Sequence, residues 1–164
     1  MTDATGATVD VEIVAGKGPA EMWDLVTNVA RIGEWSPECA GGAWLDGGTP
    51  EPGARFEGYN VFSQTFKSTT PCVVTEAASP SVFEWIVLAP SLDPAYPGSI
   101  WRYEIEAAED GQAIVRHRFT HGPGVTGLKR GMAEDPGNAG AILQERLDQL
   151  RKHMTVTLEG MAAS

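Results

Sequence analysis

The segment AGAILQERLDQLRKHMTVTLEGM, residues 139–161, determines the architecture that the rest of this chain can adopt. Apolar side chains recur along it at helical spacing, and charged side chains fall on the opposite face. At about 1.5 Å per residue, such a helix is on the order of 35 Å long and can cross a whole small domain. Asn138 stands where a helix N-cap is expected. The apolar stripe comprises Leu143, Leu147, Leu150, Met154, Leu158 and Met161.

Strands and turns dominate the chain upstream of this helix. Alternating apolar and polar residues predict a first strand, and six more follow after Gly41-Gly42. Two short helices lie between them, one over 19–26 and one over 29–35 that ends before Pro37, because the residue before a proline avoids helical angles. The predicted strands are 9–14, 43–45, 54–62, 66–75, 82–88, 99–107 and 112–121.

Two segments between the later elements carry strong turn signals. Asp110-Gly111 predicts a tight hairpin between the last two strands, because both residue types tolerate the backbone angles that such turns require. The segment 122–140 is rich in glycine and proline and is predicted to be a long loop. Loops of this length are uncommon unless they are functional or mobile, so this one could gate an entrance.

Several local motifs carry a family resemblance. PAEMWDLVT at 19–27 resembles the first-helix motif of the SRPBCC superfamily, and EWSPEC at 34–39 resembles its second-helix signature. GARFEGYN at 53–60 resembles the following strand of an actinobacterial-type branch. WRY at 101–103 and GQA at 111–113 fall where that branch has its final hairpin. The resemblance covers nearly the whole chain.

This resemblance implies an α+β helix-grip fold, in which a curved antiparallel sheet of about seven strands wraps around the long C-terminal helix. Two short helices follow the first strand in that fold. We therefore expect a single SRPBCC/START-like domain over 9–162, preceded by a flexible N-terminus at 1–8. The superfamily includes polyketide cyclases and aromatases, lipid-transfer START domains, plant hormone receptors and pollen allergens. Membership therefore implies a fold more firmly than an activity.

Charge balance and cysteine content limit the partners and the compartment. The 164 residues include 22 acidic and 12 basic ones, and the net charge of −10 disfavours binding to nucleic acid or to anionic membranes. The polar N-terminus lacks signal-peptide features, and no apolar run approaches the ~20 residues of a membrane span. Two isolated cysteines, Cys39 and Cys72, are typical of reduced thiols in a cytoplasmic protein. Both a monomer and a homodimer are compatible with the sequence.

Side chains alternate across a strand, so the sequence assigns an inner and an outer face to each predicted strand. Charged residues such as Arg102 and Arg116 must face solvent, which turns their neighbours inward. The parity of 66–75 is ambiguous, and Thr70 and Cys72 are placed inward by assumption. The other inward residues are Phe56, Gly58, Asn60, Phe62, Phe83, Trp85, Val87, Trp101, Tyr103, Ile105, Val115, His117, Phe119 and His121.

This mostly aromatic inner face admits two interpretations. It can be a closed core whose polar groups are satisfied internally, or it can line an apolar cavity with a few orienting polar groups. The resemblance favours a cavity for a small hydrophobic ligand, because one helix rarely fills a sheet of such curvature. Trp35 also suits a core position. The residues expected to contact the ligand are Trp35, Phe56, Phe62, Thr70, Phe83, Trp85, Trp101, Phe119, Leu143 and Leu147.

His117 is the strongest candidate for chemistry, since an unperturbed histidine pKa of ~6.5 suits proton transfer near neutral pH. The alternative is a core histidine bonded to a backbone carbonyl. Tyr103 and Asn60 could donate hydrogen bonds to a developing enolate oxygen. His117 and His121 lie ~13 Å apart on one strand, too far to share an ion, so no metal is expected. No motif in the sequence calls for another cofactor.

Three functions are compatible with these features. The first is a binding or carrier module for a small hydrophobic molecule, polyketide-like or lipid-like. The second is a polyketide cyclase/dehydrase-like enzyme that uses acid–base residues in the same cavity. The third is a regulatory or stress protein in which ligand occupancy alters a partner surface. The sequence favours ligand binding, because no pair of residues in it is diagnostic of catalysis.

Overall fold

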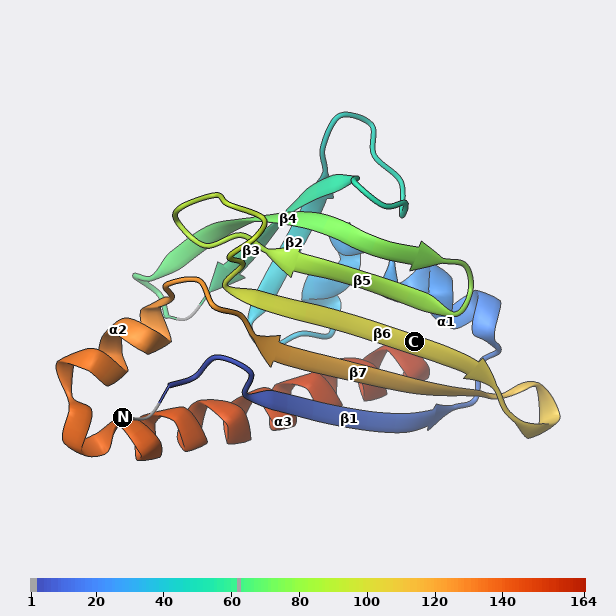
Figure 1. Cartoon of the computed structure of the whole chain (residues 1–164). Helices are drawn as coiled ribbons and strands as arrows, with labels where there is room; N and C mark the ends of the chain where they lie inside the picture. The colour runs from blue at the N-terminus through green and yellow to red at the C-terminus, as the bar shows by residue number, and fades with distance from the viewer. Residues whose placement is uncertain (1–2, 62) are drawn as a thin grey trace.

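A seven-stranded antiparallel sheet is the framework of the computed structural model, which describes residues 3–61 and 63–164 (Figure 1). Its strand order is β1-β7-β6-β5-β4-β3-β2. Every strand from β2 onward therefore pairs with the next strand of the chain, and β1 forms the edge beside β7. The strands are β1 (Thr8–Ala15), β2 (Cys39–Trp44), β3 (Arg55–Val61), β4 (Lys67–Ala78), β5 (Val82–Val87), β6 (Ser99–Ala107) and β7 (Ala113–His121).

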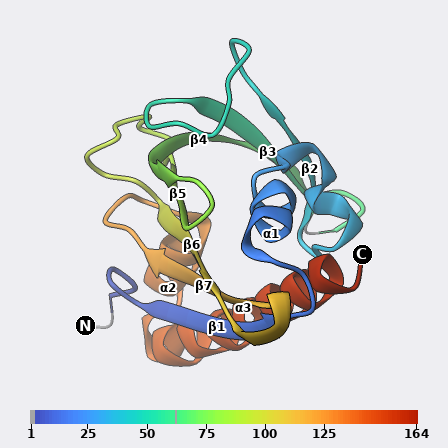
Figure 2. The same cartoon turned by 90° about the vertical axis from the view of Figure 1, so that its right-hand side faces the viewer.

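Two α-helices lie on the concave side of this sheet. Figure 2 shows the sheet curving around α1, with α3 running along the open side of the curve. The α-helices are α1 (Pro19–Val26), α2 (Gly127–Glu134) and α3 (Ala139–Ala163). The short 3-10 helices are η1 (Val29–Glu34), η2 (Glu109–Gly111) and η3 (Pro136–Asn138). This arrangement confirms the predicted α+β helix-grip fold, including the two short helices after the first strand.

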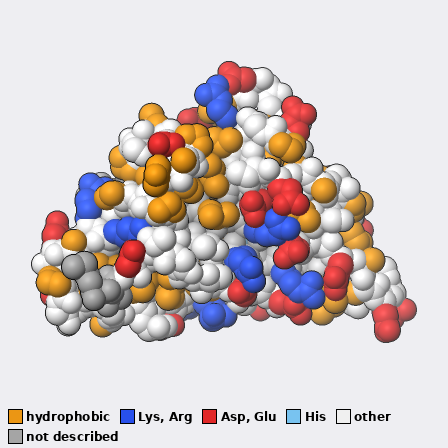
Figure 3. Space-filling model, viewed as in Figure 1, with side chains coloured by type: hydrophobic (Ala, Val, Ile, Leu, Met, Phe, Trp, Pro, Cys, Tyr) orange, Lys and Arg blue, Asp and Glu red, His pale blue; other side chains and the backbone are white. Residues whose placement is uncertain are grey.

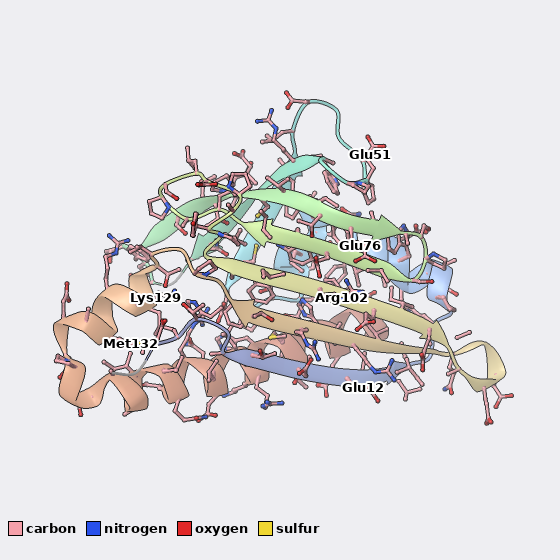
Figure 4. The ribbon with its side chains drawn as sticks, viewed as in Figure 1. Glu12, Glu51, Glu76, Arg102, Lys129 and Met132 are labelled. Atoms are coloured by element: carbon pink, nitrogen blue, oxygen red, sulfur yellow. The ribbon has the colours of Figure 1, made fainter. Side chains whose placement is uncertain are left out.

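Ion pairs cover the outer face of the sheet, as the alternation of charged and apolar residues predicts. Arg102 of β6 contacts Glu76 of β4 at 2.7 Å and Glu84 of β5 at 3.1 Å. Figure 4 shows Arg102 and Glu76 on this face, and Figure 3 shows the alternating charges across it. Exposed pairs of this kind contribute at most about 1 kcal/mol each, so they chiefly keep the face polar. Two further pairs link β7 to β1, Arg116–Glu12 and Arg118–Asp10.

One strand begins earlier than its sequence predicts. β2 starts at Cys39 rather than at residue 43, because Gly41 and Gly42 are extended and not a break. A Cβ atom on Gly42 would lie 2.8 Å from the carbonyl oxygen of Glu57 and 3.0 Å from that of Val29. Glycine is needed here for the close approach of three backbone segments. β4 also extends three residues beyond its predicted end, from 75 to 78.

The segment 122–140 is not the long loop that its composition predicts, because it contains α2 and η3. Thr126 caps α2, and its Oγ1 accepts a hydrogen bond from the backbone N–H of Lys129 at 3.3 Å. Gly131 lowers the intrinsic helix propensity of α2, so the sequence pattern does not indicate a helix there. The buried side chain of Met132 supplies the tertiary packing that compensates.

Residues 3–8 pack against the domain more closely than the free terminus predicted for 1–8. Ala4 is fully buried, and the backbone N–H of Gly6 donates to the carbonyl oxygen of His121 at 2.8 Å. Thr8 already belongs to β1. Residues 1 and 2 lie outside the described part of the chain.

The apolar stripe of α3 is buried only in its C-terminal part. Leu150, Met154, Leu158 and Met161 are at most 3 % exposed and belong to the main core. Leu147 is only partly buried, which differs from the expectation for the middle of the stripe. Leu147 packs at the edge of this core, whereas Ile142 and Leu143 in the first turns of α3 pack against α2. Within the described residues, no helix is both long and apolar enough to span a membrane.

Trp35 packs against α3 at a glycine and takes the core position that the sequence left open. A Cβ atom added at Gly160 would lie 2.9 Å from Cδ1 and 3.1 Å from Cβ of Trp35. The guanidinium of Arg31 lies 5.0 Å from the centroid of the Trp35 ring. These contacts fix the end of η1 against the C-terminal turns of α3.

Leu150→Ala should lower the free energy of unfolding by about 2–5 kcal/mol, because Leu150 is 1 % exposed and its loss leaves a cavity in the core. Val156→Ala on the same helix is the control, since Val156 is 43 % exposed. Chemical denaturation of both variants measures the difference. Equal effects in the two variants would contradict the assigned helix face.

Gly160→Ala should destabilise the protein by about 1–3 kcal/mol, although alanine favours helices, because the new methyl group would clash with Trp35. Gly140→Ala in the same helix is the matched control. No atom lies within 4 Å of its Cβ position, so this change should be neutral or stabilising by up to about 1 kcal/mol. Thermal unfolding compares the two, and a stabilised Gly160→Ala variant would show that Trp35 does not pack there.

Candidate ligand-binding cavity

A cavity of about 790 Å³ lies between the concave face of the sheet and α3. β3 to β7 contribute the alternate residues that the sequence assigns to the inner face, and α3 contributes one side. The expectation of a cavity rather than a closed core therefore agrees with the geometry. The sequence-predicted site residues that line it are Phe56, Asn60, Thr70, Phe83, Trp85, Trp101, Tyr103, His117 and Phe119.

Four of the predicted ligand contacts are not among the lining residues that the structure describes. Trp35 packs against Gly160, and Leu147 lies at the edge of the main core. Leu143 belongs instead to a small cluster with Met132, because the start of α3 faces α2. Phe62 falls outside the described residues. A helical stripe indicates which face of a helix is buried but not which part of it meets a cavity.

The cavity wall changes character along the strands, because residues paired across neighbouring strands form rows. We call the end with Asn60 and Thr70 the polar end, and the end with Tyr103 and His117 the aromatic end. Beyond the aromatic end, Ile105 belongs to the closed core. From the polar end, the rows are Asn60–Ser68, Gly58–Thr70, Phe56–Cys72–Val87–Ser99–His121, Trp85–Trp101–Phe119 and Phe83–Tyr103–His117.

Stacked rings form the aromatic end. The ring planes of Trp85 and Trp101 differ by 6°, with centroids 6.2 Å apart. Tyr103 and His117 face each other across β6 and β7 at 3.8 Å, with 9° between their planes. Phe83 adds a further ring at 5.2 Å from Trp85. This part of the wall offers a broad apolar surface of little flexibility, suited to burying hydrocarbon or aromatic groups.

His117 is buried in this end without polar partners. His117 is only 4 % exposed, and neither of its ring nitrogens has a hydrogen-bond partner among the described residues. Burial lowers the pKa of His117 to about 3, so the imidazole is neutral at physiological pH. Burial likewise raises the pKa of the Tyr103 hydroxyl well above its usual value of 10. The histidine is therefore neither of the alternatives that the sequence suggests, since it lacks a backbone partner and does not titrate near neutrality.

The polar end contains hydrogen-bonded side chains. Asn60 Nδ2 donates to Thr70 Oγ1 at 3.2 Å, and Trp101 Nε1 donates to Ser99 Oγ at 3.0 Å. His121 has its pKa lowered to about 4, first by burial and then by the positive charges of nearby basic side chains. The polar groups thus satisfy one another in part and leave some hydrogen-bonding capacity toward the cavity.

An ionic cluster at this end was not foreseen from the sequence. Glu38, just before β2, accepts hydrogen bonds from Arg146 and from His153 of α3, the latter at 2.7 Å to Nδ1. Arg146 Nη2 reaches the second Glu38 oxygen at 3.0 Å, and Nη1 also contacts Gln149 Oε1. The only signal was the spacing of Arg146, Gln149 and His153, which places them on one helix face beside Leu150. All four cluster residues line the cavity.

Exposed apolar side chains surround the opening of the cavity. Phe66, Leu92 and Val125 are 59 to 61 % exposed, and each belongs to the lining. They come from the β3–β4, β5–β6 and β7–α2 connections, which lie at the same end of the sheet (Figure 1). Figure 3 shows the apolar surface gathered over the β5–β6 connection. The mouth of the cavity is therefore apolar, although the chain as a whole is acidic.

Both cysteines line the cavity as free thiols. Burial raises the pKa of Cys72 to about 12, so this thiol stays protonated near neutral pH. Burial also raises the pKa of Cys39. Among the described residues, no group of three or more His, Cys, Asp or Glu side chains is arranged to hold a metal ion.

Solved structures of low sequence identity share this fold. The solution NMR structure of the polyketide cyclase-like protein Cgl2372 from Corynebacterium glutamicum has a TM-score of 0.69 at 23 % identity, over 96 % of this chain and 90 % of that chain. XoxI from Bacillus cereus has a TM-score of 0.64 at 9 % identity, over 96 % and 94 %. Ms6760 from Mycobacterium smegmatis has a TM-score of 0.63 at 14 % identity, over 99 % and 93 %. At these identities the likeness shows the fold alone.

A comparison with curated proteins found no match. Residues 6–155, however, match the family model described as polyketide cyclase/dehydrase and lipid transport. This match extends from the start of β1 to the middle of α3 and so includes every strand of the cavity wall. The superfamily resemblance inferred from the local motifs is consistent with it. The chain belongs to the polyketide cyclase/dehydrase and lipid transport family.

Proposed function

We propose that this protein binds a small hydrophobic molecule, polyketide-like or lipid-like, in the cavity between the sheet and α3. The observation that carries the proposal is a cavity of about 790 Å³ whose wall grades from stacked aromatic rings to a few hydrogen-bonding groups. Ligand sites in proteins typically have this volume and this mixture of groups. The exposed apolar side chains of Phe66, Leu92 and Val125 at the opening would contact such a molecule as it enters.

A cyclase-like reaction is the alternative, and the site geometry favours it less. His117 has no group beside it that would orient or charge its ring, and its pKa of about 3 is unsuited to proton transfer near neutrality. Asn60 lies at the polar end, whereas Tyr103 and His117 lie at the aromatic end. The three residues proposed from the sequence as one catalytic set are thus distributed along the cavity, which suits contact with an elongated ligand.

Four further assignments are part of the same proposal, and the first three rest on the sequence. GARFEGYN at 53–60 supports membership of an actinobacterial-type branch. The net charge of −10 supports the absence of nucleic-acid partners, and the two isolated cysteines support a cytoplasmic location. A monomer suffices for the proposed site, since one chain supplies the whole cavity wall described above.

Filling the cavity should weaken binding. Val87→Trp places an indole in the middle row of the wall and should weaken the binding of 9-anthracenemethanol, an uncharged three-ring probe, by about tenfold or more. Val14→Trp adds the same side chain at a position of β1 that is 60 % exposed and should leave affinity unchanged. Isothermal titration calorimetry measures both. Saturable binding that survives Val87→Trp would place the ligand elsewhere, and no binding to the wild type would count against the proposal.

The neutral His117 should make the protein less stable in acid. Its pKa is about 3 when folded and about 6.5 when unfolded, so the unfolded chain takes up the proton first as the pH falls. Below pH 6.5, stability should fall by up to about 1.4 kcal/mol per pH unit from this side chain alone. His117→Gln removes this contribution, so its unfolding free energy should decline less steeply between pH 6.5 and 4. Parallel slopes for variant and wild type would show that His117 is not buried as a neutral ring.

The same variant separates a carrier from an enzyme. A carrier with His117→Gln should still bind the probe at neutral pH and show no turnover in either form. An enzyme that uses this histidine should turn over a polyketide-like substrate in the wild type and lose about 10²–10⁴-fold in the variant. Product formation followed by mass spectrometry distinguishes the two, and wild-type turnover that depends on His117 would establish the alternative function.

A further inference from the structure

A purely structural link between β2 and α3 does not explain the position of the ionic cluster formed by Glu38, Arg146, Gln149 and His153. Its four side chains line the cavity, and its two charged members are only partly exposed, with Glu38 at 16 % and Arg146 at 24 %. The cluster links the start of β2 to α3 at the polar end, where the backbone N–H of Val61 donates to the carbonyl oxygen of Glu38 at 2.9 Å. A ligand that fills the cavity from the aromatic end would meet the cluster with its other end.

We propose that this cluster is the head-group subsite of the cavity and that it selects an uncharged oxygen-bearing group, a hydroxyl or a carbonyl, over a carboxylate. The inference rests on the proposed binding function and specifies the chemistry of the ligand. The apolar part of the ligand would lie on the stacked rings of Trp85 and Trp101, and its oxygen would contact the cluster.

Free hydrogen-bonding positions of the cluster define which head group it can take. Arg146 directs Nη1 and Nη2 at Glu38 and shares Nη1 with Gln149 Oε1. Its Nε–H and the second Nη2–H remain without a partner among the described residues, as do the amide hydrogens of Gln149. His153 uses Nδ1 toward Glu38 and leaves Nε2 without a bond. The cluster thus offers mostly donors, and the imidazole can offer one acceptor, which matches an oxygen that accepts and, in a hydroxyl, also donates.

Charge balance decides between a neutral head and an anionic one. Burial raises the pKa of Glu38, but the hydrogen bonds and charges of Arg146 and then His153 outweigh it and hold that pKa below its usual value. Glu38 therefore stays ionised and neutralises Arg146 internally. A ligand carboxylate would lose its hydration and find the charge of Arg146 already neutralised by Glu38. A hydroxyl or a carbonyl group pays a smaller desolvation penalty and can use the free donors.

Glu38 also occupies the Nη1/Nη2 edge of Arg146, one of the two edges through which a guanidinium can bind a carboxylate. Arginine binds carboxylates best through two parallel hydrogen bonds, and Glu38 already makes them through Oε1 and Oε2. The carboxylate of this one residue thus disfavours acids in the subsite, because it cancels the charge of Arg146 and uses one of its two carboxylate-binding edges. Removal of its charge should reverse the preference, because Arg146 would then face the cavity as an unneutralised cation.

Two matched probes test this specificity, 9-anthracenemethanol and 9-anthracenecarboxylate, which differ in the head group on the same three-ring body. At pH 7 the wild type should bind the alcohol about tenfold or more tightly than the carboxylate. Glu38→Gln should raise the affinity for the carboxylate, relative to the alcohol, by about tenfold or more. Isothermal titration calorimetry gives both affinities, and thermal unfolding checks that each variant is folded.

Control variants separate the subsite from the overall charge. Glu76→Gln removes the same charge from a carboxylate that pairs with Arg102 on the outer face, and should leave the ratio of the two affinities unchanged. Arg146→Gln in the Glu38→Gln background should cancel the gain in carboxylate binding while avoiding an unpaired buried carboxylate. The double variant therefore assigns the gain to Arg146.

The outcomes distinguish this inference from the function on which it rests. If neither probe binds the wild type, the proposed binding function fails. If both bind and Glu38→Gln changes their ratio no more than Glu76→Gln does, the cluster is not the head-group subsite. A wild type that prefers the carboxylate would overturn the assigned ligand class, even if the cluster contacts the head group.

Discussion

Burial of the C-terminal half of α3 is the interaction on which the rest of the structure depends. Its apolar side chains pack on the concave face at the end of the sheet where Ile105 and Val115 lie. Burial of each side chain stabilises the fold by on the order of 1.5–3 kcal/mol. The first turns of the helix pack against α2 instead, and its middle turns, with Arg146 and Gln149, face the sheet across the cavity. The side chains that anchor the helix are Leu150, Met154, Leu158 and Met161.

The change from an aromatic to a polar cavity wall follows from the strand register, because every second residue along a strand belongs to the next row of the wall. At the aromatic end, an unpaired His117 costs on the order of 1–3 kcal/mol in lost hydrogen bonding. Its ring instead stacks face to face on Tyr103. At the polar end, by contrast, Glu38 and Arg146 satisfy each other. The domain thus places its least favourable polar group where a ligand would be most apolar, and its best-paired groups near the entrance.

The fold and most of the cavity wall could be predicted from the sequence, because local patterns determine them. Arg102 and Arg116 must face solvent, and strict alternation then places the inward residues of β6 and β7 correctly. The Glu38–Arg146 pair could not be predicted, because its members are 108 residues apart and meet only through the curvature of the sheet. α2 was missed for a related reason, since its glycines disfavour a helix that tertiary contacts of Met132 stabilise.

The strand order has a consequence for how the domain is assembled. β2 to β7 are joined by successive hairpins, but β1 pairs with β7, so that Val9 faces Phe119 across more than a hundred intervening residues. During synthesis the first strand must remain without its partner until most of the chain has emerged. Non-local pairing of this kind slows folding, because a long loop must close before the contact stabilises it. The last strand and the last helix complete the cavity together, so the cavity forms only after both have been synthesised.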